Sequence, residues 1–163
     1  MVGKLSNFSG WSTIKGQYIS RKHFSTEVLQ RLTDKIALSE SQHGAEFVLA
    51  LEPVTPSHIN VPRERALEVF GRLGVWDTPR NTGVLLYISF DLQAIEIIAD
   101  RGLEVDNAEW ARICEHMASR FKAGEYKEGI NDAINAITEV LIRVCPPSEN
   151  DEKNWLSDTP VVL

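Results

Sequence analysis

The spacing of apolar positions predicts four helices. In each of them, apolar residues recur every three or four positions, which places them on one face of a helix. Ser25 and Asp106 stand where helix-capping side chains belong, and Pro62 suits a first helical turn because its missing N–H would have no partner there. The expected helices cover residues 25–41, 62–73, 106–121 and 126–144.

Short continuous apolar runs predict three strands. They lie at residues 46–52, 84–90 and 94–99, and the last two form a hairpin around the turn 91–93. Because the hairpin strands are apolar on both faces, we expect helices to cover both faces of the sheet. The hairpin is the most strand-like part of the chain.

The order of these elements predicts the fold. A strand, a helix and a following strand of the same sheet normally form a right-handed crossover with parallel strands. We therefore predict an α/β protein: a three-layer α/β/α sandwich with a mixed central sheet that contains the hairpin and with helices on both faces. We expect one domain over residues 24–145, a flexible basic segment over 1–23 and an acidic tail over 146–163.

The predicted topology brings polar residues to one rim of the sheet. If strands 46–52 and 84–90 are parallel, their first residues share an edge, and the antiparallel strand 94–99 ends there. The opposite rim would hold residues 52–60 and the turn at Asp91. The candidate binding residues of the first rim are His43, Glu46, Asp77, Thr78, Arg80, Asn81, Asp100 and Arg101.

These rim residues are compatible with more than one role. Glu46, Asp77, Asn81 and Asp100 offer the oxygen ligands that Ca²⁺ or Mg²⁺ prefers. With the arginines and His43, they also suit acid–base or phosphate-directed chemistry. Alternatively, the acids only cap helices and brace loops, with Asp77 and Asn81 closing Asx turns.

Composition and charge narrow the class of protein. The 163 residues carry a formal net charge of −6, which argues against nucleic acid as a partner. The chain shows neither a secretion-signal pattern nor an apolar run of roughly 18 residues, so we expect no membrane insertion. Cys114 and Cys145 indicate buried free thiols in a reducing compartment. We expect a soluble, monomeric, cytoplasmic protein.

Three segments in this order resemble the TPM domain. They are Arg80–Ile88 with the following Asp91, Ile95–Leu103, and Phe121–Ile130, where a Phe-Lys-Ala-Gly-Glu-Tyr sequence joins two helices. The family includes thylakoid-lumen phosphatase-like proteins of photosystem II repair and bacterial membrane-anchored proteins. The resemblance covers roughly residues 24–143 and implies an α/β/α sandwich, with acid phosphatase activity or Ca²⁺ binding near the hairpin loops in some members.

Four further segments are similar to a bacterial subgroup of short soluble members. They are His43–Glu46, Val75–Thr78, Ala99–Gly102 and Asn154–Val161. Our first hypothesis is accordingly a cytoplasmic binding or adaptor module that uses the rim loops for a small ligand or a protein partner. The alternatives are a weak or metal-assisted phosphatase-like hydrolase and a structural domain without a ligand site.

Overall fold

The computed structural model describes residues 11–148 and 154–163. Five helices and four strands follow one another in these residues. The helices are α1 (Trp11–His23), α2 (Thr26–Glu40), α3 (Pro62–Arg72), α4 (Asn107–Lys122) and α5 (Tyr126–Val144). The strands are β1 (Glu46–Glu52), β2 (Gly83–Ser89), β3 (Ala94–Ala99) and β4 (Val161–Val162).

The four strands form a mixed sheet in the order β3-β2-β1-β4. β1 pairs with β2 in parallel, from Glu46 opposite Gly83 to Glu52 opposite Ser89. β2 and β3 form the antiparallel hairpin. Both relations confirm the predicted topology.

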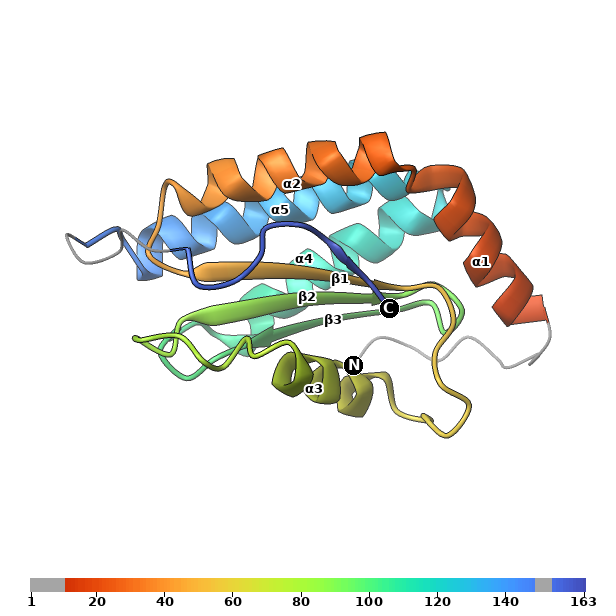
Figure 1. Ribbon diagram of the computed structural model, residues 1–163, viewed down its shortest axis with the longest axis horizontal. Coiled ribbons are helices and arrows are strands. Elements are labelled where there is room, and N and C mark those ends of the chain that lie inside the picture. The colour runs from red at the N-terminus through yellow and green to blue at the C-terminus, as the bar shows by residue number, and fades with distance from the viewer. Residues whose placement is uncertain (1–10, 149–153) are drawn as a thin grey trace.

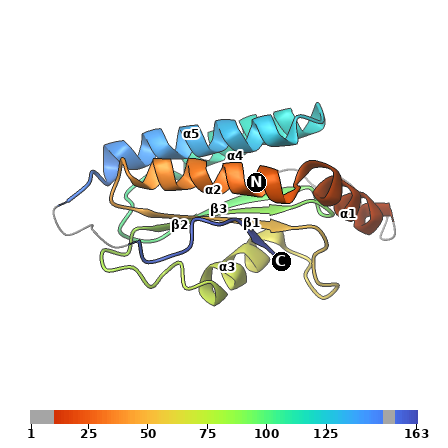
Figure 2. The same ribbon diagram turned by 45° about the horizontal axis from the view of Figure 1, so that its top comes forward.

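Helices cover both faces of the sheet (Figure 1, Figure 2). Helices α2, α4 and α5 lie on one face and α3 lies on the other, so the chain is the predicted three-layer sandwich. Alternate residues of β1 enter different cores because successive side chains of a strand point to opposite faces. Phe47, Leu49 and Leu51 join the larger core, whereas Val48 and Ala50 join the smaller core under α3.

Local sequence explains where the helices begin. The hydroxyl of Ser25 accepts a hydrogen bond from Val28 N–H, and the carboxylate of Asp106 accepts one from Ala108 N–H. Each satisfies a backbone donor that a first helical turn leaves free. Pro62 stands at the start of α3, as predicted. Among the described residues, no helix has the length and apolar character needed to cross a membrane.

The chain before residue 24 differs from the predicted flexible segment. Residues 11–23 form α1, and residues 1–10 lie outside the described part. Ile19 is buried, and Gly16 approaches the loop after β1 so closely that a Cβ would lie 2.0 Å from the carbonyl oxygen of Pro53. The apolar pattern is weak because a glycine, which carries no side chain, makes part of the contact.

The predicted acidic tail also contains structure. Its strand β4 pairs in parallel with β1, with Val161 opposite Ala50 and Val162 opposite Leu51. Residues 154–163 run alongside β1 at the edge of the sheet (Figure 1). Two paired residues are too few to produce an alternating pattern, so periodicity does not reveal this strand. Residues 149–153 lie outside the described part.

Candidate functional site

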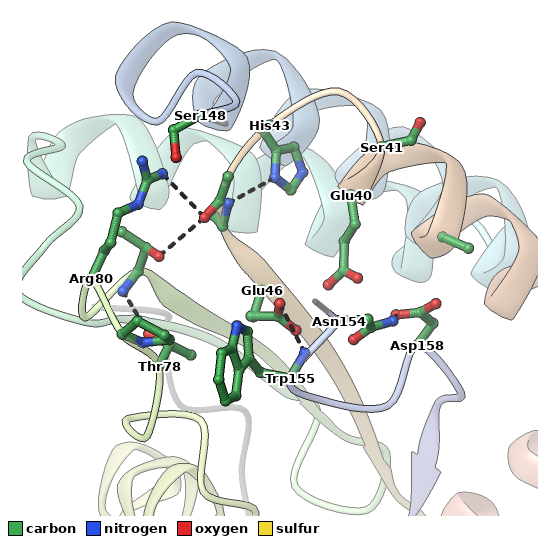
Figure 3. Close-up of a pocket in the computed structure, with 15 residues that line it drawn as sticks. Glu40, Ser41, His43, Glu46, Thr78, Arg80, Ser148, Asn154, Trp155 and Asp158 are labelled. Atoms are coloured by element: carbon green, nitrogen blue, oxygen red, sulfur yellow. Dashed lines mark hydrogen bonds between the residues drawn. The ribbon is translucent and has the colours of Figure 1, made fainter. Parts of the chain in front are cut away.

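A cavity of about 460 Å³ opens at the end of the sheet where β1 and β2 begin, which we call the loop end (Figure 3). Pockets that hold small molecules measure roughly 300–1,000 Å³. The end of α2, the start of β1, the loop before β2 and the C-terminal part of the chain surround it. It is lined by Ala37, Glu40, Ser41, His43, Gly44, Ala45, Glu46, Thr78, Pro79, Arg80, Thr82, Ser148, Asn154, Trp155 and Asp158.

His43 lines this cavity, but its ring is tied into the protein interior. Its Nδ1 accepts a hydrogen bond from Ala45 N–H at 3.2 Å, so Nε2 carries the ring proton and donates to Ser39 Oγ at 3.0 Å. The Ser39 hydroxyl lies 2.6 Å from Thr138 Oγ1, which donates to the carbonyl of Ile134. Every polar atom in this chain of contacts has a partner.

These contacts give His43 a structural role. Its side chain is buried, and burial lowers its pKa to about 4. The neutral ring donates a proton to Ser39 in the hydrogen bond, so it does not act as a base toward that hydroxyl. His43 instead braces the turn between α2 and β1.

Glu46, at the start of β1, binds the C-terminal segment. One carboxylate oxygen accepts from Trp155 N–H at 3.2 Å and the other from Leu156 N–H at 2.9 Å. The side chain is buried. Glu46 therefore joins two parts of the chain that are more than one hundred residues apart.

Two carboxyl groups of the cavity were not predicted. Glu40, the last residue of α2, accepts a hydrogen bond from Phe47 N–H at 2.6 Å and also hydrogen-bonds Asp158. Burial and this contact with Asp158 raise the pKa of Glu40 to about 9, so its carboxyl group is protonated at neutral pH. Figure 3 shows both side chains at the cavity. In the sequence, the one indication that Glu40 is unusual is its position at a helix C-terminus, where a negative charge is unfavourable.

Arg80 and Thr78 hold the loop that forms another wall. Arg80 Nη2 donates to the carbonyl of Gly44 at 3.2 Å and lies 2.8 Å from Cys145 Sγ. Thr78 is buried, and its hydroxyl accepts from Thr82 N–H at 2.9 Å. Together they fix the loop against the start of β1.

Asn81, Asp100 and Arg101 meet beside the hairpin, as the predicted topology requires. Arg101 donates to the side-chain oxygen of Asn81 at 3.4 Å, and its backbone N–H donates to Asp100 Oδ1 at 2.7 Å. Asn81 has a φ of 55°, a conformation that asparagine tolerates. Gly102, which follows Arg101, packs so tightly that a Cβ would lie 2.2 Å from the carbonyl oxygen of Arg80.

The two remaining carboxylates on this side of the sheet differ. Asp100 Oδ2 is buried, and within residues 11–148 and 154–163 it has no hydrogen-bond partner. Asp77 is exposed, and only its backbone N–H is engaged in that part of the chain, with the carbonyl of Gly74 at 2.9 Å. Neither Asp77 nor Asn81 closes the predicted Asx turn.

The four predicted Ca²⁺ or Mg²⁺ ligands are not all brought together: Asn81 and Asp100 meet at Arg101, apart from Glu46. Glu46 is bound by backbone amides at the cavity, and the oxygen of Asn81 faces the positive guanidinium of Arg101. Among the described residues, no group of three or more His, Cys, Asp or Glu side chains is placed to hold a metal ion. Asp100 Oδ2 is one orphaned oxygen, whereas Ca²⁺ takes roughly 6–8 oxygen ligands. Among the described residues, Glu46, Asp77 and Asp100 thus do not form one cluster of carboxylate ligands, and the metal site stays a prediction.

The opposite end of the sheet, which we call the turn end, contains a buried ion pair. Arg65 donates to both carboxylate oxygens of Glu52, at 2.6 Å through Nη2 and 3.0 Å through Nε, and also contacts Glu68 at 2.9 Å. Tyr87 donates its hydroxyl proton to Glu52. Burial and this hydrogen bond raise the pKa of Tyr87 well above its usual range.

The hairpin turn adds a second network at the turn end. The Asp91 carboxylate accepts from the N–H and the hydroxyl of Thr55, both at 2.8 Å. It also accepts from the Ser89 hydroxyl at 2.8 Å and from Leu92 N–H at 2.9 Å. Sequence reasoning placed Asp91 on this rim but did not identify the network around it.

Besides the loop-end cavity, the described residues contain a groove and two free thiols. The groove, of about 360 Å³, lies between α4 and α5, where His116 pairs with Asp132 at 3.0 Å. Burial raises the pKa of Cys114 to about 11, so its thiol is protonated at neutral pH. Cys145 is also free and buried.

The comparisons with known proteins agree with this architecture. A family model described as the TPM domain matches residues 19–140. The NMR structure of the BA42 protein from the psychrophilic bacterium Bizionia argentinensis is similar to the chain, with a TM-score of 0.76 and 26% sequence identity. The similarity covers 86% of this chain and 96% of the BA42 chain. No curated protein matches significantly. The chain belongs to the TPM domain family.

Proposed function

We propose that this protein is a binding module that holds a small polar ligand in the loop-end cavity. The cavity itself is the observation that carries the proposal: its volume of about 460 Å³ lies in the range of small-molecule pockets, roughly 300–1,000 Å³. Its walls come from segments far apart in the sequence and are fixed by the contacts of His43, Thr78 and Arg80. Such a preformed wall lowers the ordering cost of binding.

The lining favours a ligand that donates hydrogen bonds. Glu40 and Asp158 line the cavity with carboxyl oxygens that retain further acceptor capacity, and the Asn154 amide donates to Asp158 Oδ1 at 2.7 Å. Trp155 offers an aromatic surface, because its side chain is 52% exposed at the cavity. A polar side chain of a partner protein meets the same requirements. A protein that binds its partner in this way acts as an adaptor.

A phosphatase-like activity has less support from the geometry. Such an enzyme needs an activated nucleophile or a metal-bound water. The Ser39 hydroxyl accepts from His43 in the interior, and both cysteines are buried. We expect no turnover of p-nitrophenyl phosphate above that of a heat-treated sample. Turnover that is lost in Asp77→Ala and Asp100→Ala would favour the hydrolase instead.

The two free, buried cysteines support a location in the cytoplasm. Free thiols persist where the cellular environment is reducing. Fractionation of the source cells, followed by detection of the protein with an antibody, tests this part of the proposal. Recovery in an oxidising compartment would contradict it.

Ligand-observed NMR with a library of small amines, amides and alcohols tests the binding function. We expect some of these fragments to bind, and their affinity to fall at least tenfold in Ser41→Trp, which fills the cavity from its edge. Ser119→Trp is the matched control, because Ser119 is an exposed serine on α4 that does not line the cavity. Either an absence of bound fragments or equal binding to both variants would contradict the proposal.

A further inference from the structure

Residues 154–163, which we call the C-terminal strap, are held to the sheet by a small set of contacts. The Glu46 carboxylate accepts from two strap amides, those of Trp155 and Leu156. The strap ends in β4, after which Leu163 N–H donates to the carbonyl of Leu51 at 2.9 Å. Leu156 packs against the smaller core, and Pro160 is buried. The strap is thus a short segment docked on one edge of the sheet.

One contact of the strap sets two carboxyl groups against each other. Asp158 of the strap hydrogen-bonds Glu40 at the end of α2. Glu46 of β1 is a third carboxyl group near Glu40, and Phe47 N–H supplies one hydrogen bond. The titratable side chains of the other cavity walls are His43, which is neutral, and Arg80, which donates to the Gly44 carbonyl.

We propose that docking of the C-terminal strap is a pH-dependent switch, in which a proton held between Glu40 and Asp158 joins the strap to the body of the protein. With that proton, the pair is a carboxylic acid that donates to a carboxylate. Without it, two negative charges face each other in a partly buried wall, where such repulsion is stronger than in water. The strap then loses one attachment and gains a repulsion.

The direction of the pH dependence follows from the two states of Glu40. In the docked state its pKa is about 9, chiefly because of burial and the contact with Asp158. When the strap leaves, water reaches Glu40 and its pKa falls toward the usual value near 4.5. The docked state therefore binds the proton more tightly. Docking is strongest below about pH 4.5 and weakens as the pH rises through about 9, by up to about tenfold per pH unit.

The switch would also control the cavity. Asn154, Trp155 and Asp158 of the strap form part of its wall, so release of the strap removes one side of the site. This consequence rests on the proposed binding function, whereas the docking equilibrium itself requires no ligand. A fragment screen at pH 5, where the strap is docked, therefore tests the binding function alone. A pH titration of the strap without fragments tests the switch alone.

Fluorine NMR of protein labelled with 5-fluorotryptophan tests the switch, with the Trp155 signal assigned through Trp155→Phe. Between pH 5 and pH 9 we expect the ratio of released to docked strap to increase by up to about tenfold per unit in the wild type. Glu40→Gln keeps a hydrogen-bond donor without the ionisation, so its ratio should be independent of pH. Asp158→Asn, which removes the repulsion from the strap side, should also have a reduced slope.

The matched control is Glu139→Gln, which changes an exposed glutamate on α5 and should keep the wild-type slope. A wild-type ratio that does not change between pH 5 and pH 9 would overturn the proposal. So would a Glu40→Gln variant that retains the wild-type pH dependence.

Discussion

The two ends of the sheet carry similar polar residues but arrange them differently. At the turn end, Glu52 and Asp91 receive hydrogen bonds from neighbours that surround them, and α1 packs over the loop beside them through Gly16. At the loop end, Glu40 and Asp158 hydrogen-bond each other beside a cavity of about 460 Å³, and Asp158 also accepts from the Asn154 amide at 2.7 Å. Asp100 Oδ2 has no partner among the described residues. Polar residues at a sheet edge thus indicate a binding site only where they line a cavity instead of filling the space between neighbouring side chains.

The largest expected effect concerns the closed network at the turn end. Arg65→Ala should lower the free energy of unfolding by about 3–5 kcal/mol, because it leaves Glu52 buried without its ion-pair partner. Urea denaturation at pH 7 measures the change. The double variant Glu52→Leu/Arg65→Leu removes both charges and should lose less stability than Arg65→Ala. A single variant as stable as the wild type would contradict the account of the turn end.

Asp91→Ala should have the next largest effect. The variant leaves Thr55 N–H and Leu92 N–H without the carboxylate that accepts from them. Hydrogen bonds to charged groups contribute roughly 1.5–3 kcal/mol each, and water will replace part of the loss, so we expect a cost of about 2–3 kcal/mol. Thermal and urea denaturation should agree on this value. A cost below about 0.5 kcal/mol would mean that the hairpin turn does not depend on this network.

The buried His43 predicts a specific dependence of stability on pH. Its pKa is about 4 in the folded protein and near 6.5 when the chain unfolds, so the unfolded state binds more protons as the pH falls. Stability is therefore retained above about pH 6.5 and lost toward pH 4, with about 2 kcal/mol lost between pH 7 and pH 5. His43→Gln should reduce this loss in urea titrations at the two pH values. An equal loss in the variant would show that His43 is not the group responsible.

The smallest expected effect belongs to Asp77, the loop-end counterpart of Asp91. Its carboxylate is exposed and accepts no hydrogen bond within the described part of the chain. Asp77→Ala should change the free energy of unfolding by less than about 0.5 kcal/mol, as is usual for surface substitutions. Denaturation of this variant beside Asp91→Ala compares an aspartate in the loop before the hairpin with one in the hairpin turn. A cost near that of Asp91→Ala would remove the distinction between the two ends.

The sequence predicted the sandwich because most helices and strands of this chain have a clear pattern of apolar residues, and the order of these elements determines how the strands pair. Helical spacing identified α2, α3, α4 and α5, and three continuous apolar runs identified β1, β2 and β3. The handedness of the strand–helix–strand crossover then favoured parallel β1 and β2. Two elements carry too little pattern to be found in this way. α1 makes part of its contact through Gly16, and β4 has only two residues.

The candidate site was predicted in part. The topology correctly placed Asn81 and Arg101 side by side, because both flank the same hairpin. It did not reveal that His43 points into a buried hydroxyl network or that Glu46 binds the strap. Glu40 and Asp158 lie outside the predicted strand ends, and their contact depends on how a terminal segment docks, which periodicity does not encode.

Localisation of a bound fragment on the protein tests the central claim most directly, because both ends of the sheet are observed at once. The measurement is a series of amide and indole NMR spectra at pH 5 during titration with the tightest-binding fragment. We expect the shifts to centre on Ala45, Thr82 and the Trp155 indole, with Thr55 and Leu92 unchanged. Shifts centred on Thr55 and Leu92, or on the groove between α4 and α5, would contradict the assignment of the loop end as the binding site.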